Sequence, residues 1–238
     1  MKAKICIVTP GYISSSPRVV KEADALLQAG FDVRVVFSQG NLGAVREFDE
    51  GLLKEKEWRG DSIGWSSLKR DEMALYWKSK FRYHIVRRLP SVSWSFDRLA
   101  ECAEGRIYKE LAELAASEKA DLYIGHYPTG LAAAGYAASR YEARLAYDAE
   151  DFHTGEVPDN RNGIRQKKMI KLIENRYLPR CSYVSAASKL IADELVKCYK
   201  IPSPIAIYNV FPWNERAKID GQIKIRIINV RAVITRFG

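Results

Sequence analysis

Residues 4–37, KICIVTPGYISSSPRVVKEADALLQAGFDVRVVF, decide the fold that we expect of this chain. Residues 5–9 form a short apolar run, and Ser16 before a proline is typical of the N-cap that begins a helix. Gly30 suits the left-handed position that ends such a helix, and residues 33–37 resume as a second buried strand. The stretch therefore predicts a strand, a helix and a parallel strand, which is a βαβ unit.

The same alternation of patterns recurs from about residue 104 to residue 208. Apolar residues at helical spacing precede the strand-like segments ADLYIGH and RLAYD, and further helix and strand patterns follow them. Because parallel neighbours need crossover helices, we expect a Rossmann-like, doubly wound parallel sheet over residues 1–208. Residues 38–99 lack a clean period and are expected to be an insertion between elements of the sheet. Residues 209–238 are expected to be a hinge and the stub of an incomplete second domain.

Composition excludes several classes of protein. Of the 238 residues, 47% are hydrophobic and 28% charged, which is typical of a folded domain, and no apolar run approaches the ~20 residues that span a bilayer. The four cysteines are too scattered for a zinc site or a disulfide framework, so we expect reduced thiols in a cytoplasmic protein without a signal peptide. The net charge of +9 indicates an anionic partner without identifying it.

The loop inside the βαβ unit, residues 10–16, is the first candidate site, because ligands of open α/β folds bind at the carboxyl edge of the sheet. Gly11 permits close approach of a ligand to the backbone, and Tyr12 and Ser16 flank it, so all three are expected to bind substrate. Arg18 lies in the first turn of the helix, where the helix dipole disfavours a cation. We expect Arg18 to bind substrate, because a bound anion or carboxylate would explain its position. Solvation at the surface would explain it as well. The single glycine does not make a dinucleotide-binding GxGxxG motif.

Two later strands end in polar residues. His126 closes the run DLYIGH, and the segment DAEDFH brings Asp148, Glu150, Asp151 and His153 together. We expect His126 and Asp151 to be catalytic and the other three to bind substrate, since carboxylates hold hydroxyl groups and accept their protons. The same sequence pattern would also arise if the histidine were hydrogen-bonded to the backbone and the carboxylates capped a helix. A carboxylate metal site is the alternative that we consider less favoured, and we expect no metal.

Basic and aromatic residues mix in residues 76–94, YWKSKFRYHIVRRLPSVSW. This composition suits the surface of an anionic membrane, where rings lie among headgroups and cations meet phosphates. Burial of the rings, with the cations solvated, is the alternative, and nucleic acid is an unlikely partner because the segment has no strand-like platform of aromatics. The residues expected to contact the membrane are Trp77, Lys78, Lys80, Arg82, Arg87 and Arg88; Tyr83, Phe81 and Trp94 complete the aromatic set.

Four stretches together resemble the amino-terminal half of the family 4 glycosyltransferases, retaining enzymes built from two Rossmann domains in the GT-B architecture. They are SPRVVKEADALLQAGFDVRVV, ADLYIGHYPTGLAAA, LAYDAEDFHTGE and ENRYLPRCSYVSAAS, with YNVFP resembling the interdomain hinge. The resemblance covers residues 3–212. It implies one lobe of a GT-B enzyme that transfers a sugar from a nucleotide-sugar to a hydroxyl of a glycan or lipid-linked acceptor, with retention and without a resident cofactor. His126 matches the histidine that this family places beside the donor sugar.

In that family the amino-terminal domain binds the acceptor, whereas the carboxy-terminal domain supplies basic residues and a glutamate pair for the donor. We expect this sequence to lack that carboxy-terminal domain. It would then be the acceptor half of an enzyme, truncated before the donor domain and inactive unless a separate donor-domain chain completes it. The alternative is a non-catalytic membrane-docking or scaffolding module, peripheral at the inner face of the membrane. A self-sufficient small α/β enzyme is less favoured, because no arrangement of a nucleophile with its base is visible in the sequence.

Overall fold

The computed structural model describes residues 2–95 and 98–210. Residues 1–208 form one compact unit. The hinge and stub expected over residues 209–238 lie, beyond residue 210, outside the described residues. Among the described residues, no helix is long and apolar enough to cross a bilayer.

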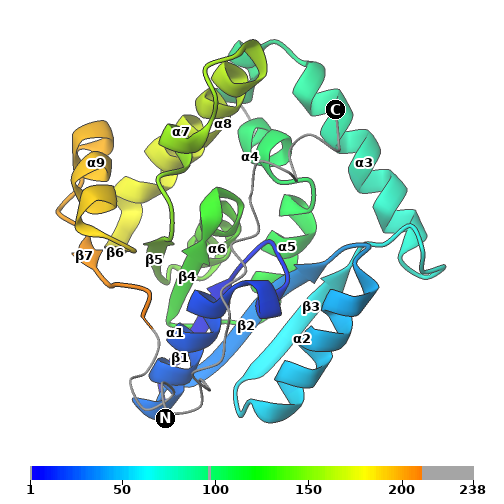
Figure 1. Ribbon diagram of the computed structural model, residues 1–238, viewed down its shortest axis with the longest axis vertical. Coiled ribbons are helices and arrows are strands. Elements are labelled where there is room, and N and C mark those ends of the chain that lie inside the picture. The colour runs from blue at the N-terminus through cyan, green and yellow to red at the C-terminus, as the bar shows by residue number, and fades with distance from the viewer. Residues whose placement is uncertain (1, 96–97, 211–238) are drawn as a thin grey trace, which may run out of the picture. The chain divides into compact units, whose positions relative to one another are not determined.

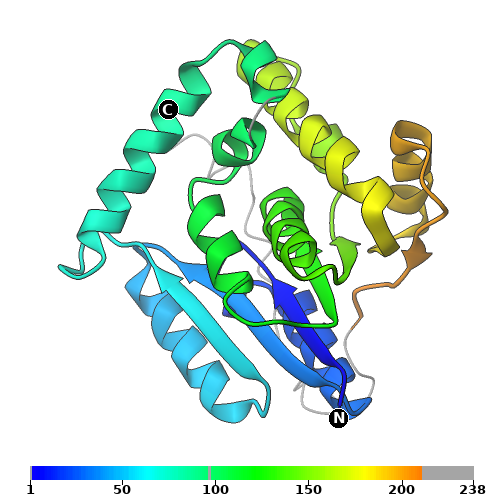
Figure 2. The same ribbon diagram turned by 180° about the vertical axis from the view of Figure 1, so that it is seen from behind.

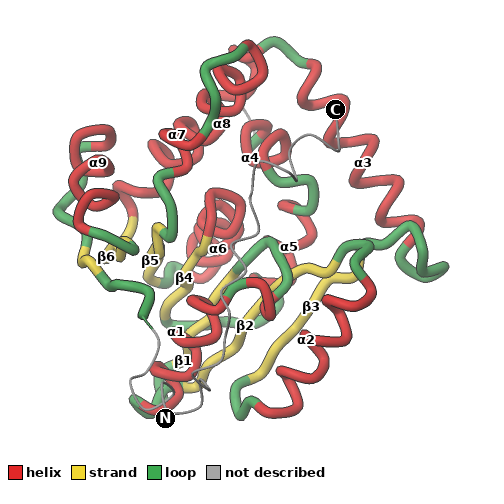
Figure 3. The backbone as a smooth tube through the Cα atoms, in the orientation of Figure 1, coloured by secondary structure: helices red, strands yellow, loops and turns green. Residues whose placement is uncertain are grey.

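Seven described strands form one parallel sheet in the order β3-β2-β1-β4-β5-β6-β7 (Figures 1 and 3). Their bounds are β1 (Lys4–Val8), β2 (Asp32–Gln39), β3 (Arg59–Gly64), β4 (Leu122–His126), β5 (Arg144–Ala149), β6 (Cys181–Ala186) and β7 (Ile205–Ala206). The chain moves outward from β1 to β3 and then returns to add β4 on the other side of β1. The expected doubly wound, Rossmann-like sheet is confirmed, and the order of the strands reverses between β1 and β4.

Helices cover both faces of the sheet, as the front and back views in Figures 1 and 2 show. They are α1 (Pro17–Gln28), α2 (Gly43–Glu55), α3 (Met73–Arg88), α4 (Leu99–Glu104), α5 (Tyr108–Ala115), α6 (Tyr127–Tyr141), α7 (His153–Glu156), α8 (Arg161–Tyr177) and α9 (Lys189–Tyr199), with short 3-10 turns at Ile13–Ser15, Ser91–Ser95 and Leu178–Arg180. Gly30 has the left-handed φ of 92° expected after α1, and Ser188 caps α9 through the Ile191 amide. Ser16 occupies the N-cap of α1 but its side chain makes no capping hydrogen bond.

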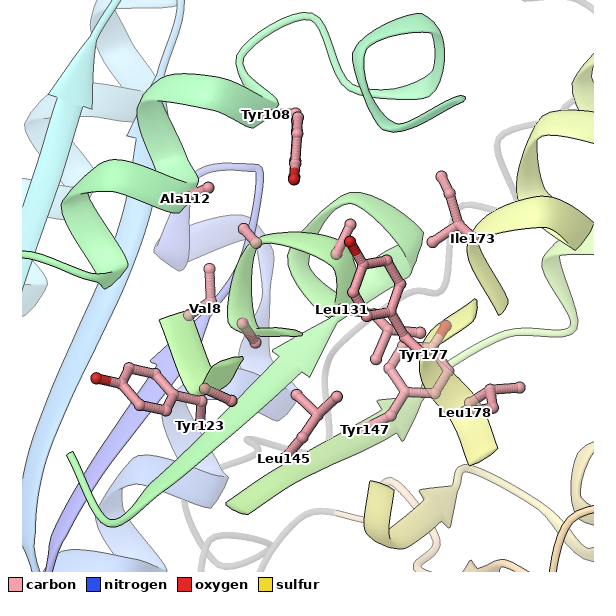
Figure 4. Packing of buried hydrophobic residues seen from close by; sticks show 14 of the residues in the cluster. Val8, Tyr108, Ala112, Tyr123, Leu131, Leu145, Tyr147, Ile173, Tyr177 and Leu178 are labelled. Atoms are coloured by element: carbon pink, nitrogen blue, oxygen red, sulfur yellow. The ribbon is translucent and has the colours of Figure 1, made fainter. Parts of the chain in front are cut away.

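Alternate residues of the strands divide the core into two layers. On β1, Ile5 and Ile7 pack on the side of α1 and α2, whereas Cys6 and Val8 pack on the side of α5 and α6. Figure 4 shows the second layer, in which buried aromatic rings of the sheet and of α8 surround α6. The labelled members of that layer include Tyr108, Tyr123, Leu131, Leu145, Tyr147, Ile173 and Tyr177.

The junction of β4 and α6 is tightly packed. A Cβ on Gly130 would lie 2.5 Å from the Val8 carbonyl oxygen, and one on Gly125 would lie 2.4 Å from the Leu131 Cα. Between them, Tyr127 has a φ of 60°, which costs a residue with a side chain roughly 1–3 kcal/mol. The backbone turn after β4 therefore lies directly against the end of β1.

The expectation of an insertion over residues 38–99 is wrong. The segment contains α2 and β3, and β3 extends the sheet by pairing with β2 along its length. The period was not visible because β3 is an edge strand of sequence RGDSIG with few buried side chains. Helix α3 is equally hard to recognise, since large apolar residues lie on its solvent face as well as on its buried face.

Candidate functional site

Five charged side chains gather at the carboxyl edge of the sheet, where the strand order reverses between β1 and β4. His126 ends β4, Asp148 lies near the end of β5 with Glu150 just after it, and Arg18 and Glu22 lie one turn apart on α1. We call these residues the His126 cluster. Crevices at this position bind the ligands of open α/β folds.

His126 holds two carboxylates, one at each ring nitrogen. Its Nδ1 lies 2.8 Å from Glu150 Oε1, and its Nε2 lies 2.7 Å from Glu22 Oε2. Burial by itself would lower the pKa of this fully buried imidazole, but hydrogen bonds to Glu150 and Glu22 raise the pKa to about 10. The ring is therefore an imidazolium that donates both N–H groups. Both ring nitrogens of His126 are thus engaged by carboxylates, and neither is free to contact a ligand in this arrangement.

Asp148 and Arg18 form a bidentate ion pair. Arg18 Nε and Nη2 donate to the two carboxylate oxygens, with Nη2 2.7 Å from Oδ1, and Ser185 also donates to Oδ1. Burial raises the pKa of Asp148, but the hydrogen bond from Arg18, the charge of His126 and the hydrogen bond from Ser185 outweigh it and lower the pKa. The carboxylate that we expected to explain Arg18 thus belongs to the chain itself. Arg18 and Asp148 neutralise each other, so neither presents a free charge to a ligand.

Glu22 is the residue of this site that the sequence interpretation missed. Its side chain is 21% exposed and that of Glu150 is 14% exposed, whereas His126 is fully buried. These two carboxylates therefore offer the negative charge that can reach a ligand. The available signal was the spacing of Arg18 and Glu22, because residues four apart lie on the same face of a helix whose N-terminus meets the candidate loop.

Tyr127 adds a hydroxyl beside the cluster. Its hydroxyl lies 3.4 Å from Glu150 Oε2, and burial together with the charge of Glu150 raises its pKa to about 12. The phenol is therefore neutral near pH 7 and can donate a hydrogen bond. Its left-handed backbone is the type of strained conformation that recurs at functional sites.

The three residues of the loop 10–16 that we expected to bind substrate differ in how accessible they are to a ligand. A Cβ on Gly11 would meet nothing within 4 Å, so the space above its backbone is open. Tyr12 points elsewhere, because its hydroxyl accepts a hydrogen bond from the Leu42 amide at 2.9 Å. Ser16 is buried at the start of α1. Of the three, Gly11 leaves the most room for a ligand.

Asp151 and His153 belong to the turn that leads into α7. Asp151 is exposed and His153 is half-buried, and neither contacts His126. Burial lowers the pKa of His153, so its imidazole is neutral near pH 7. One potential ligand atom each from Asp151, His153 and Glu156 lies within 4.8 Å of the others. His126, Asp148 and Glu150 form a second group of this kind, in which both ring nitrogens of His126 already face carboxylates.

The residues predicted to contact a membrane lie on α3. Trp77 and Phe81 are 55% and 71% exposed, and Lys78 and Arg88 are exposed beside them. Lys80 extends over the Trp77 ring, with Nζ 4.8 Å from its centre.

Two members of that set, Arg82 and Arg87, face the protein instead. Arg82 forms a bidentate pair with Glu110, and Arg87 donates to the Tyr83 hydroxyl and the Ala103 carbonyl. Trp94, which belongs to the aromatic set of this segment, is completely buried and donates its indole N–H to the Val86 carbonyl. For Trp94 the structure agrees with the alternative stated for this segment, in which the rings are buried.

No protein-family model matches the sequence, and no curated protein is similar to it at a significant level. Among solved structures, the sucrose-phosphate synthase of Thermosynechococcus elongatus aligns with a TM-score of 0.54 at 10% identity, over 91% of this chain and 52% of that one. HepE of Anabaena in complex with UDP aligns with a TM-score of 0.51 at 14% identity, over 90% of this chain and 45% of that one. LpCGTa in complex with UDP gives a TM-score of 0.51 at 10% identity, over 92% of this chain and 55% of that one.

The chain thus spans about half the length of the solved proteins that it matches. Identities this low show a shared fold. The expected Rossmann-like α/β fold is therefore confirmed by both the strand order and the comparisons.

We predict that Arg18→Met destabilises the protein by ~3–5 kcal/mol, because it removes the bidentate partner of the buried Asp148 carboxylate. The double variant Arg18→Met/Asp148→Asn should recover a large part of that loss. Arg140→Met, which breaks an exposed pair with Glu113, should cost at most ~1 kcal/mol. Urea unfolding measures all three, and equal losses at Arg18 and Arg140 would contradict the assignment.

We also predict that the His126 imidazolium makes folding sensitive to alkali. Its pKa in the folded protein, about 10, exceeds the ~6.5 of an unfolded chain, so its stabilisation is complete below about pH 6.5. That stabilisation is lost as the pH rises to about 10, at no more than ~1.4 kcal/mol per pH unit. Urea midpoints across this range should fall more steeply for the wild type than for His126→Gln, while His84→Gln keeps the wild-type slope. Should His126→Gln not fold, ¹⁵N shifts of the wild-type ring test the same point, and a neutral ring at pH 8 would refute it.

Proposed function

We propose that this chain is the acceptor-binding half of a family 4, GT-B glycosyltransferase that transfers a sugar from a nucleotide-sugar to a hydroxyl with retention. The observation that carries the proposal is the His126 cluster at the strand-order reversal, with two partly exposed carboxylates fixed by one buried imidazolium. The motifs quoted from the sequence and the fold shared with proteins solved with UDP support it.

Carboxylates held in this way suit the recognition of sugar hydroxyls. An ionised carboxylate only accepts hydrogen bonds, and a sugar hydroxyl donates them readily. Because His126 orients one oxygen of Glu22 and one of Glu150, the side chains are set before the acceptor arrives, which lowers the entropic cost of binding. We assign Glu22 as the group that accepts a hydrogen bond from the acceptor hydroxyl and Tyr127 as a neutral donor beside it.

The donor belongs, in this proposal, to a second half in the same or another polypeptide. In the family that the sequence resembles, the glutamate pair and the basic residues that hold the diphosphate belong to that second half. Electrostatic stabilisation of the departing diphosphate would then come from that second half. The chain by itself is expected to bind acceptor sugars and to leave nucleotide-sugars unchanged.

Saturation-transfer NMR of the chain with a panel of mono- and disaccharides and with UDP tests this function. We expect contacts with at least one sugar, and Glu22→Gln should weaken its affinity about tenfold, because a hydrogen bond to a charged group is lost. Glu47→Gln, an exposed carboxylate on α2, serves as the matched control and should bind as the wild type does. Contacts with UDP alone, or sugar binding that ignores Glu22, would contradict the acceptor assignment.

A second candidate function, membrane docking, is favoured by the solvent face of α3. Met73, Trp77, Phe81 and Ile85 recur every four residues and are 40–71% exposed, which makes a continuous apolar ridge. We call these four residues the α3 ridge. Large apolar side chains on one helix face, bordered by exposed basic residues, favour a helix that lies in the plane of a lipid surface.

Flotation with vesicles tests the ridge. The wild type should bind an equimolar mixture of phosphatidylcholine and phosphatidylglycerol and be released by salt, because the basic residues meet the anionic headgroups. Trp77→Ala/Phe81→Ala should abolish this binding, whereas Phe48→Ala removes an aromatic ring of the same 71% exposure from α2 and should not. Equal binding of all three proteins would refute docking through α3.

A further inference from the structure

A hollow between α3, α5 and α6 shares no residue with the His126 cluster. Its volume is about 600 Å³, which is large enough for a small ligand. Basic side chains and tyrosine rings dominate its walls. The lining residues that matter for its chemistry are Lys78, Arg82, Arg98, Lys109, Tyr108 and Tyr136. We call this hollow the α3 pocket.

Cations outnumber carboxylates four to two in the α3 pocket, and both carboxylates are already engaged. Glu110 accepts two hydrogen bonds from Arg82, at 2.8 and 2.6 Å. Glu113 accepts one from the Tyr136 hydroxyl at 2.7 Å and lies 3.5 Å from Arg140. Neither carboxylate therefore neutralises the other basic residues of the pocket.

Three of the four cations thus lack a carboxylate partner. None of the described carboxylates forms an ion pair with Lys78, Lys109 or Arg98, although the three come from three different elements. The Arg98 guanidinium lies 4.7 Å above the Tyr136 ring, which leaves its N–H groups able to meet an anion. Positive charges that lie close together repel one another, which raises the electrostatic energy of the pocket. A bound anion would offset this repulsion.

We propose that the α3 pocket binds the phosphate group of a phosphorylated ligand, between the Lys78 and Lys109 ammonium groups and the Arg98 guanidinium. Lysine and arginine are the side chains that form charge-assisted hydrogen bonds with phosphate oxygens. The tyrosine walls suit an adjoining uncharged portion of the same molecule, since aromatic faces pack on sugar or glycerol carbons. This inference does not depend on the sugar-transfer function.

The phosphate can come from a soluble phosphate ester or from the headgroup of a lipid. The second source gains support from the fold, because Lys78 directly follows Trp77 of the α3 ridge on the same helix. A bilayer that meets the ridge would bring its headgroups to the mouth of the pocket. The two sources share the same chemistry and are distinguished by experiment.

³¹P NMR with sn-glycerol 3-phosphate measures the soluble source, and flotation with equimolar phosphatidylcholine and phosphatidylglycerol measures the lipid source. Lys78→Gln/Lys109→Gln should weaken binding of whichever source is used by about tenfold or more. Lys78→Arg/Lys109→Arg should retain it. Lys54→Gln/Lys119→Gln, which removes two exposed charges elsewhere, is the matched control and should bind as the wild type does.

Each outcome decides the proposal. Line broadening of glycerol phosphate that disappears only in Lys78→Gln/Lys109→Gln supports a soluble ligand. Flotation that is lost in that variant, without any glycerol phosphate binding, supports a lipid headgroup. No binding of either probe, or equal binding by Lys78→Gln/Lys109→Gln and the control variant, overturns the pocket. Because both lysines are exposed, unchanged circular dichroism and melting temperature should accompany every variant.

Discussion

The structure depends on neutralising the charges that it buries at the reversal of strand order. Arg18 neutralises Asp148 on β5. The same guanidinium donates a hydrogen bond to the Ile207 carbonyl, at 2.6 Å, just beyond β7. It therefore ties α1 to the middle and to the far edge of the sheet. A buried ion pair contributes little net stability compared with an apolar pair, but removal of one partner is costly, so this contact specifies one arrangement of α1.

His126 fixes the positions of the two carboxylates that form the candidate site. Its imidazolium separates two carboxylates that would otherwise repel each other, and it directs both toward the open edge of the sheet. The protonated state follows from its surroundings, because the carboxylates raise the pKa more than burial lowers it. Both ring nitrogens of His126 already face carboxylates, which is why we assign substrate contact to its neighbours rather than to the histidine.

Local patterns were reliable where neighbours in the sequence decide the structure. The βαβ unit of residues 4–37 and the left-handed Gly30 were predicted, because helix ends and buried strands follow from residues a few positions apart. The error over residues 38–99 has a local cause. Strand β3 and helix α3 carry few buried side chains on a clear period, since an edge strand and an outlying helix need only partial burial, so their patterns resemble a loop.

The amino-acid sequence by itself determined the class of fold and the edge of the sheet at which polar residues collect. Which polar groups face one another was decided only by the tertiary structure. Arg18 and Asp148 are 130 residues apart, and His126 and Glu22 are 104 apart, so no local spacing reveals those pairs. Burial of Trp94 and exposure of Trp77 were decided in the same way, by whether another element happened to cover the ring. The strength of a charge depends on what surrounds it, and in this protein the surroundings come from distant parts of the chain.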